Sequence, residues 1–429
     1  MKNKIIEQTA LAARQTQVWL QAIGTETKNR ALTAIANALH KNSGKIVAAN
    51  KKDLEAAKKA RLAEPLLKRL LFDEKKIEEV IAGIESLKQL DDPTGKILAA
   101  TKLDKGLKLY KVTCPIGVIG VIFESRPDAL VQISTLCLKS GNGVLLKGGS
   151  EAARTNKILF DIIEDASKRA GIPKGWIGLL QTREDVSRML RMDKYIDLLI
   201  PRGSYELVRY IKENTNIPVL GHAEGICHVY IDGDVDLNMA VHITVDSKCQ
   251  YPAVCNAAET LLVDKKIAKK FLSLIKIALE EKGVEIRGCE KTRKVIDCVA
   301  ATEKDWRAEY LDYILSVKVV DGINGAIEHI NKYGSKHTDA IVTQNRKTAE
   351  KFMSLVDSAD VFWNCSTRFS DGYRFGLGAE VGISTNKIHA RGPVGLEGLT
   401  IYKWKLYGSG QIVADYAEGR KKFTHKKIK

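Results

Sequence analysis

The run Pro115-Ile-Gly-Val-Ile-Gly-Val-Ile-Phe123 decides the fold class, because its residues are apolar in succession and rich in β-branched side chains. Such a run is typical of a strand that is buried on both faces of a parallel sheet. The preceding stretch, 107–114, instead alternates apolar and polar residues, which is typical of a strand exposed on one face. The sequence therefore predicts an internal strand at 115–123, and 107–114 as one arm of a hairpin before it.

Short apolar runs then alternate with helical patterns along the chain. The first set of runs comprises 144–147, 177–180, 198–201, 217–220 and 228–232, with helices expected from Ser150 and Ser204. The second set comprises 260–263, 314–320, 340–343 and 361–363. Repeated strand-then-helix units indicate doubly wound α/β sheets. The first hundred residues show apolar positions at helical spacing, so we expect helices there.

These patterns predict an α/β protein with two doubly wound domains and a small β element. We assign residues 1–98 and 115–232 to the first domain and residues 233–392 to the second. The small element then consists of residues 99–114 with residues 393–429.

The composition excludes several classes of protein. The 429 residues are 45% hydrophobic, which is too apolar for a disordered chain, and no charge-free stretch approaches the roughly 18 apolar residues of a membrane helix. The N-terminus carries no secretory signal pattern, so we expect a cytoplasmic protein that does not enter a membrane.

The formal net charge of +16 fits either a nucleic-acid binder or an enzyme with anionic substrates. Aromatic residues make up 6% of the chain and do not cluster with Lys and Arg, so we expect no nucleic-acid partner. Six basic residues lie within positions 420–429, where we predict a solvated, mobile tail.

Two strand-to-helix turns of the first domain have features of phosphate sites. They are Lys147-Gly-Gly-Ser150 and Pro201-Arg-Gly-Ser204. Glycine lets a ligand approach the backbone, and the serine can cap the helix whose N-terminus attracts an anion. Each turn alone is compatible with an ordinary βα connection, but two in one sheet favour a dinucleotide site. Neither contains G-x-G-x-x-G, so the cofactor is expected to bind differently from that of an ordinary Rossmann oxidoreductase.

The eight cysteines include no C-x-x-C pair, so we predict neither a disulfide framework nor a bound metal. Cys255, in Tyr251-Pro-Ala-Val-Cys255-Asn-Ala-Ala, directly precedes a buried strand near the predicted domain junction. There it would meet a ligand, and its backbone N–H would face a developing oxyanion. A buried structural thiol is the alternative, and Cys249 is a rival because the adjacent Lys248 would lower its pKa.

Four long segments together resemble the aldehyde dehydrogenase superfamily, and most closely its gamma-glutamyl phosphate reductase branch. They are Pro115-Ile-Gly-Val-Ile-Gly-Val-Ile-Phe-Glu-Ser-Arg-Pro-Asp128, the segment around Cys255, Phe375-Gly-Leu-Gly-Ala-Glu-Val-Gly-Ile-Ser384 and His389-Ala-Arg-Gly-Pro-Val-Gly-Leu-Glu-Gly-Leu-Thr400. The resemblance extends from the N-terminal helices to about Tyr407. It implies an aldehyde dehydrogenase-like fold in which the first domain binds a nicotinamide cofactor and the second carries the nucleophile. The small β element would pair between subunits of a homodimer or tetramer.

The resemblance also implies a reaction. It is the NADPH-dependent reduction of L-glutamyl 5-phosphate to L-glutamate 5-semialdehyde and phosphate through a Cys thioester, the second step of proline biosynthesis from glutamate. The nucleophile of the family is the cysteine before Asn-Ala, which is Cys255 here, with Asn256 as a candidate oxyanion donor. Functional coupling to glutamate 5-kinase is a further implication. The preference for NADP over NAD rests on the resemblance, since no motif in the chain reads the 2′-phosphate.

The remaining candidate site residues follow from the resemblance and divide into two groups. The cofactor-binding group is Lys147, Gly149, Ser150, Gly203, Ser204 and Glu309, with Glu309 on the nicotinamide ribose. The substrate-binding group is Arg126, Arg391 and Gly392, because guanidinium groups and backbone N–H donors suit a carboxylate and a phosphate.

Two positions depart from the hydrolytic aldehyde dehydrogenases. Those enzymes carry Pro-Trp-Asn where this chain has Glu124-Ser125-Arg126, and a general-base Glu where this chain has His222. Loss of the base suits an enzyme whose thioester must react with hydride or phosphate rather than with water. We expect His222 to be a hydrogen-bonded structural residue. The alternative function is that of a hydrolytic or CoA-acylating aldehyde dehydrogenase acting on a small aldehyde.

Overall fold

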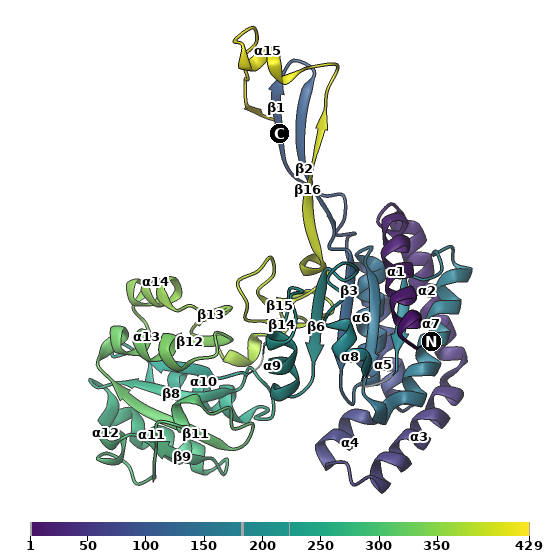
Figure 1. Cartoon of the computed structure of the whole chain (residues 1–429). Coiled ribbons are helices and arrows are strands. Elements are labelled where there is room, and N and C mark those ends of the chain that lie inside the picture. The colour runs from purple at the N-terminus through teal and green to yellow at the C-terminus, as the bar shows by residue number, and fades with distance from the viewer. Residues whose placement is uncertain (1, 182–183, 223, 429) are drawn as a thin grey trace. The chain divides into compact units, whose positions relative to one another are not determined.

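The structure is a computed structural model that describes residues 2–181, 184–222 and 224–428 (Figure 1). It divides into two compact units. Unit 1 comprises Met1–Val219, Leu377–Val381 and Val394–Lys429, and unit 2 comprises Leu220–Gly376 and Gly382–Pro393. None of the helices formed by the described residues combines the length and the apolar character that a membrane crossing requires.

Unit 1 contains a parallel sheet of four strands in the order β5-β4-β3-β6. The strands are β3 (Val118–Phe123), β4 (Gly143–Gly148), β5 (Ile177–Leu180) and β6 (Leu198–Arg202). Every residue of β3 is buried, as expected for the apolar run at 115–123. The chain proceeds from β3 to β4 and β5 on one side and then returns to place β6 on the other. This reversal is the switch point at which doubly wound sheets bind ligands, beyond the carboxyl ends of the strands.

Helices cover this sheet. They are α1 (Lys2–Leu20), α2 (Thr25–Lys41), α3 (Ser43–Lys59), α4 (Glu64–Leu70), α5 (Glu74–Gln89), α6 (Pro127–Lys139), α7 (Ala153–Arg169), α8 (Glu184–Met189) and α9 (Tyr205–Glu213). On one face, α1 packs Ala10 and Ala13 against Val118 and Leu145 of the sheet. The predicted strand at 217–220 is only an isolated bridge between Val219 and Leu199.

An antiparallel sheet in the order β16-β2-β1-β17 completes unit 1. Its strands are β1 (Ile97–Asp104), β2 (Leu107–Pro115), β16 (Thr400–Tyr407) and β17 (Lys426–Lys427), with α15 (Val413–Ala417) at the far end of the ribbon in Figure 1. The predicted hairpin arm at 107–114 is β2, and β1 is its partner.

The basic C-terminal segment is folded, which corrects the prediction of a mobile tail. Arg420 and Lys421 form ion pairs with Asp415 of α15, and Lys426 and Lys427 pair with β1 in β17. The prediction failed because it counted the cations without considering that Asp415 lies close to them in the chain.

Unit 2 is built on a parallel sheet of seven strands in the order β10-β9-β11-β8-β7-β12-β13. Its strands are β7 (Cys227–Ile231), β8 (Ala258–Asp264), β9 (Glu285–Gly288), β10 (Val299–Ala300), β11 (Ile314–Val320), β12 (Thr338–Val342) and β13 (Asp360–Trp363). Its helices are α10 (Leu237–Cys249), α11 (Ala268–Glu280), α12 (Glu290–Arg293), α13 (Gly322–Tyr333) and α14 (Arg346–Leu355). Two short strands, β14 (Gly382–Ser384) and β15 (Gly392–Val394), pair with each other.

Both faces of the seven-stranded sheet carry apolar cores, as a doubly wound fold requires. Val229 and Leu261 pack with Phe271 of α11 on one face. The intervening Tyr230 and Leu262 pack on the other face with the cluster that includes α13 and α14. This alternation follows from the two-residue period of a strand.

The boundary between the units differs from the predicted one at 232/233. It falls between Val219 and Leu220, because β7 pairs with β8 and β12 in the sheet of unit 2. Residues 99–114 belong to unit 1, as do most of residues 393–429.

Candidate active site

The amino ends of three neighbouring strands in unit 2 bring two thiols and one imidazole to one edge of the sheet. Cys227 is the first residue of β7, Cys255 lies shortly before β8, and His337 directly precedes β12. These strands are neighbours in the order β8-β7-β12, and the amino ends of parallel strands share one edge. The fold therefore gathers segments that are far apart in the sequence.

Cys255 is half-buried and lies beside two imidazole rings. One potential ligand atom from each of His222, Cys255 and His337 lies within 4.8 Å of the others. The two rings are nearly perpendicular, with centroids 4.8 Å apart. His222 donates from Nδ1 to the carbonyl oxygen of Ile383 at 2.9 Å, so the expectation that it is hydrogen-bonded is correct. Burial, with a smaller contribution from His222, holds the pKa of His337 well below its usual value, so this ring is neutral at pH 7.

The peptide of Cys255 is held closely by its neighbours. A Cβ added at Gly225 would lie 2.0 Å from the carbonyl oxygen of Cys255, so only glycine fits against this peptide. The Cys227 thiol donates to the same carbonyl at 3.2 Å. The backbone N–H of Gly225 in turn donates to Oε1 of Glu309 at 2.9 Å. The Cys255 loop is therefore fixed by packing and by hydrogen bonds.

Glu309 makes a contact that the sequence did not predict. Its carboxylate accepts from Gly225, and burial raises its pKa. This contact joins Glu309 to the segment that packs on Cys255. Its proposed contact with the nicotinamide ribose stays a prediction.

Cys249 does not have the activated thiol that its neighbour Lys248 suggested. Lys248 is fully buried and its Nζ lies 2.6 Å from Oε2 of the equally buried Glu259. Burial raises the pKa of Cys249, and the opposing effect of Lys248 is smaller. The argument for Cys249 as the nucleophile, which depended on a pKa lowered by Lys248, is therefore not supported.

Asn256 follows Cys255 and is buried. Its Nδ2 donates to the carbonyl oxygen of Ser370 at 2.7 Å, which fixes the orientation of the amide. Its role as an oxyanion donor stays a prediction.

Cations surround one carboxylate elsewhere in unit 2. Asp357 forms ion pairs with Lys387 at 2.8 Å, Arg391 at 3.2 Å and Lys336 at 3.4 Å. These partners, Lys387 foremost, lower the pKa of Asp357. Three positive charges against one negative charge leave an excess that favours anions. Gly392 follows Arg391 with φ at +81°, a conformation that glycine adopts without strain.

Arg368 is a site candidate that sequence reasoning missed. Its side chain is buried and within electrostatic reach of Cys255, and burial lowers its pKa. Its Nε donates to the Gln250 side chain at 2.9 Å. His337, Gly225 and Cys227 were missed as well. Each precedes or begins a strand, but only the order of strands reveals that these positions meet.

Two residues of the predicted cofactor-binding group, Gly203 and Ser204, lie at the switch point of the sheet in unit 1. Ser204 follows β6 and caps α9, accepting from the Leu207 N–H at 3.4 Å. Its own N–H donates to Oε2 of Glu124, which follows β3, at 3.0 Å. A Cβ on Gly203 would lie 2.5 Å from that same oxygen. An anionic oxygen thus already occupies the turn.

The other predicted turn is similar. A Cβ on Gly149 would lie 2.0 Å from a carboxylate oxygen of Glu151, which also accepts from Ser125. The buried Lys147 donates from Nζ to the carbonyl of Gly148. Ser150 is exposed at the start of a short 3₁₀ turn, Ser150–Ala152, and does not cap α7 as predicted.

Arg126 begins the connection from β3 to α6. Its guanidinium lies 3.0 Å from the carboxylate of Asp128, and the side chain remains partly exposed. Its role in substrate binding stays a prediction.

Known proteins resemble this chain in sequence and in fold. Residues 1–286 match the model of the aldehyde dehydrogenase family. The gamma-glutamyl phosphate reductase of Acetivibrio thermocellus is 64% identical over 99% of this chain and 98% of its own length. That of Methanococcoides burtonii is 52% identical over 99% and 97%. The crystal structure of gamma-glutamyl phosphate reductase from Thermotoga maritima superposes with a TM-score of 0.93 at 43% identity, covering 95% of this chain and 99% of that one.

Proposed function

This chain belongs to the aldehyde dehydrogenase family, and we propose that it catalyses the NADPH-dependent reduction of L-glutamyl 5-phosphate to L-glutamate 5-semialdehyde and phosphate. This is the second step of proline biosynthesis from glutamate. Identity above 60% to a gamma-glutamyl phosphate reductase over nearly the whole of both chains supports the substrate. The observation that carries the mechanism is the fixed Cys255 loop beside two imidazoles.

The chemistry begins at Cys255. Its thiolate attacks the acyl carbon of the substrate, and the C–O bond to phosphate breaks, so that phosphate leaves and a thioester remains. Phosphate is a good leaving group and needs no strong acid. The backbone N–H of Cys255, together with either the Asn256 side chain or Arg126, would stabilise the tetrahedral oxyanion. Reduction of the thioester then yields the aldehyde and restores the thiolate.

A nicotinamide cofactor fits the turns of unit 1. The N–H of Ser204 already binds a carboxylate oxygen of Glu124, and a diphosphate oxygen needs the same donor. Gly203 and Ser204 would hold the diphosphate, and Lys147, Gly149 and Ser150 the adenosine ribose. Glu309 would bind the nicotinamide ribose. When bound, NADPH supplies the hydride that reduces the thioester carbon.

The anionic ends of the substrate require cations. The group around Asp357 carries an excess of positive charge, and Arg391 with the backbone of Gly392 belongs to it. A substrate carboxylate would exchange places with Asp357 on Arg391 without leaving a charge unpaired. Arg126 remains the candidate from unit 1.

The alternative of a hydrolytic enzyme requires a base that activates water. The family position for that base is His222, whose Nδ1 is bound to the carbonyl of Ile383. A hydrolysed thioester would be lost to the reductive reaction, so the arrangement favours the reductase over the hydrolytic form.

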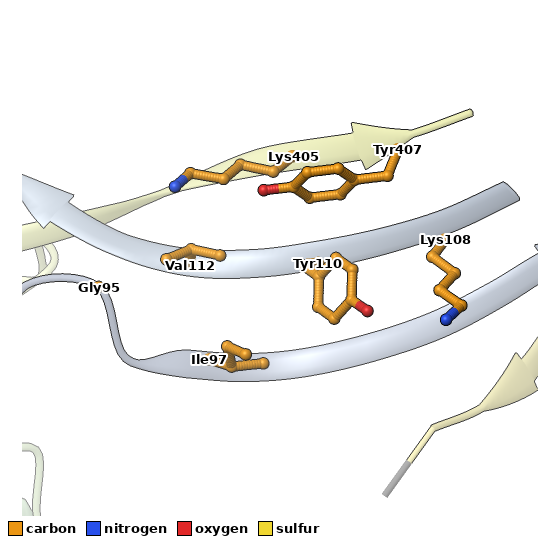
Figure 2. Close-up of a pocket in the computed structure, with 7 residues that line it drawn as sticks. All are labelled: Gly95, Ile97, Lys108, Tyr110, Val112, Lys405 and Tyr407. Atoms are coloured by element: carbon orange, nitrogen blue, oxygen red, sulfur yellow. The ribbon is translucent and has the colours of Figure 1, made fainter. Parts of the chain in front are cut away.

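An oligomer is part of the proposal. β16 is an edge strand of the antiparallel sheet and exposes Ile401, Trp404 and Leu406. Figure 2 shows a neighbouring concavity in which Tyr110 and Tyr407 lie close together over the same sheet, with ring centroids 5.5 Å apart. An exposed apolar edge strand suits pairing with a second copy. We also propose a cytoplasmic location and coupling to glutamate 5-kinase, because direct transfer would protect a labile acyl phosphate from water.

The test is the reverse reaction, measured as NADP⁺ reduction by glutamate semialdehyde with and without phosphate. We expect the rate to require phosphate, because phosphate must take the acyl group from Cys255. A rate that is independent of phosphate would show a hydrolytic enzyme instead. Cys255→Ser should abolish the activity, while the matched variant Cys249→Ser keeps most of it.

A further inference from the structure

We propose that His222, Cys255 and His337 form a binding site for a thiophilic divalent cation such as Zn²⁺. Because Cys255 is the nucleophile in the proposed function, on which this effect rests, the cation would capture its sulfur and so block the enzyme reversibly. No spacing motif predicts this site, because its three ligands come from the segment before β7, the loop before β8 and the residue before β12.

The ligand atoms are close to the required geometry. With Zn–S of about 2.3 Å and Zn–N of about 2.1 Å, tetrahedral ligand atoms lie about 3.4–3.6 Å apart. The three atoms already lie within 4.8 Å of one another. Small side-chain rotations at His222 and Cys255, which are not fully buried, would close the difference.

The hydrogen bonds around the two imidazoles suit metal binding. His337 is fully buried, and its Nε2 has no hydrogen-bond partner among the residues that the structure describes. A buried ring nitrogen without a hydrogen-bond partner costs free energy of folding, unless a bound ligand such as a metal ion contacts it. His222 donates from Nδ1 to the carbonyl of Ile383, and such a contact orients the ring and fixes the tautomer of metal-binding histidines.

The ligand set determines which cation binds. One thiolate and two imidazoles favour Zn²⁺ over Mg²⁺ or Ca²⁺, which prefer oxygen. Binding converts the Cys255 thiol to a thiolate and releases its proton to solvent. A fourth position is left for water or phosphate. Because the sulfur then bonds to the metal, it cannot attack an acyl carbon.

The test uses Co²⁺ as a spectroscopic substitute on the full-length protein. We expect one Co²⁺ per chain, with a thiolate-to-cobalt charge-transfer band in the ultraviolet and intense visible bands of tetrahedral geometry. Cys255→Ala should abolish the charge-transfer band, and His222→Asn or His337→Gln should weaken binding at least tenfold. Cys249→Ser and His40→Gln, which lie outside the cluster, should bind as the parent does.

A second readout keeps the test independent of folding defects in the His337 variant. Zn²⁺ should slow alkylation of Cys255 by iodoacetamide in the parent protein, and a chelator should restore it. No charge-transfer band, a band that survives in Cys255→Ala, or alkylation that Zn²⁺ leaves unchanged would overturn the proposal. None of these outcomes depends on turnover, so they leave the proposed reductase reaction to its own test.

Discussion

The contact between Gly225 and Cys255 gives a sharp prediction for Gly225→Ala. The new Cβ would lie 2.0 Å from the carbonyl oxygen of Cys255 and 2.5 Å from its carbonyl carbon and Cα, whereas real Cβ contacts are essentially never shorter than 3.0 Å. The peptide must therefore move by about 1 Å. The φ angle of Gly225 lies outside the left-handed region, so the cost is steric rather than conformational.

This displacement should affect catalysis more than stability. A misplacement of about 1 Å can cost about 100-fold in rate, since the attacking atom loses its alignment. Overpacking of a buried site costs about 1–3 kcal/mol in the free energy of unfolding. We expect kcat/KM for phosphate-dependent NADP⁺ reduction to fall about 100-fold in a protein that still unfolds cooperatively.

The matched control is Gly325→Ala in α13 of the same unit. Its Cβ would lie 3.6 Å from Cβ of Val320, an ordinary contact, so activity should persist and stability should hold or rise. A folded Gly225→Ala protein with kcat/KM near that of the parent would refute the reasoning. It would mean that the reacting thiol does not depend on this peptide.

Three further predictions concern charged groups. Lys248→Met leaves the fully buried carboxyl group of Glu259 without its partner, and burial already raises the pKa of Glu259 to about 7, so this group takes up a proton in the variant. The free energy of unfolding should fall by at most about 3–5 kcal/mol in denaturant titrations, and Lys248→Met with Glu259→Leu should recover most of it. Burial raises the pKa of Asp305, but hydrogen bonds, with Thr302 first, outweigh it and lower the pKa below that of an unfolded chain. The contribution of Asp305 to the free energy of unfolding is therefore present above about pH 4 and is lost as the pH falls. In acid unfolding, the difference in this free energy between the parent and Asp305→Asn should shrink. A difference that stays constant with pH would contradict this. Arg368→Gln should slow alkylation of Cys255 by iodoacetamide several-fold at pH 7, because a nearby cation favours the thiolate. An unchanged rate would show that Arg368 does not act on Cys255.

The fold was predictable where buried elements produce a local apolar pattern in the sequence. The run that became β3 is buried at every residue, and its uninterrupted apolar pattern could belong only to an internal strand or a buried helix. The β-branched residues of the run favoured the strand. The α/β class and its doubly wound form followed from the repetition of such runs.

The site was predictable only where one segment carries its own signal. Cys255 lies in such a segment, but His337 does not, because its value depends on β12 lying beside β7. Glu124 likewise meets Ser204 only because β6 returns to the side of β3. Strand order is set by packing over the whole sheet, and local patterns do not contain it. The predicted boundary at 232/233 differs from the one at 219/220 for the same reason, since β7 pairs forward with β8 rather than back with β6.

The position of Cys255 on the amino edge of its sheet also determines how its thiolate can be stabilised. In parallel α/β units the helices return toward this edge, so it receives helix C-termini, whose partial negative charge disfavours an anion. α10 ends at Cys249, shortly before the Cys255 loop. The compensation must therefore come from side chains. Arg368 supplies a buried positive charge and donates to the side chain of Gln250, the residue after α10. The same cation therefore lies close to the end of that helix and within electrostatic reach of Cys255.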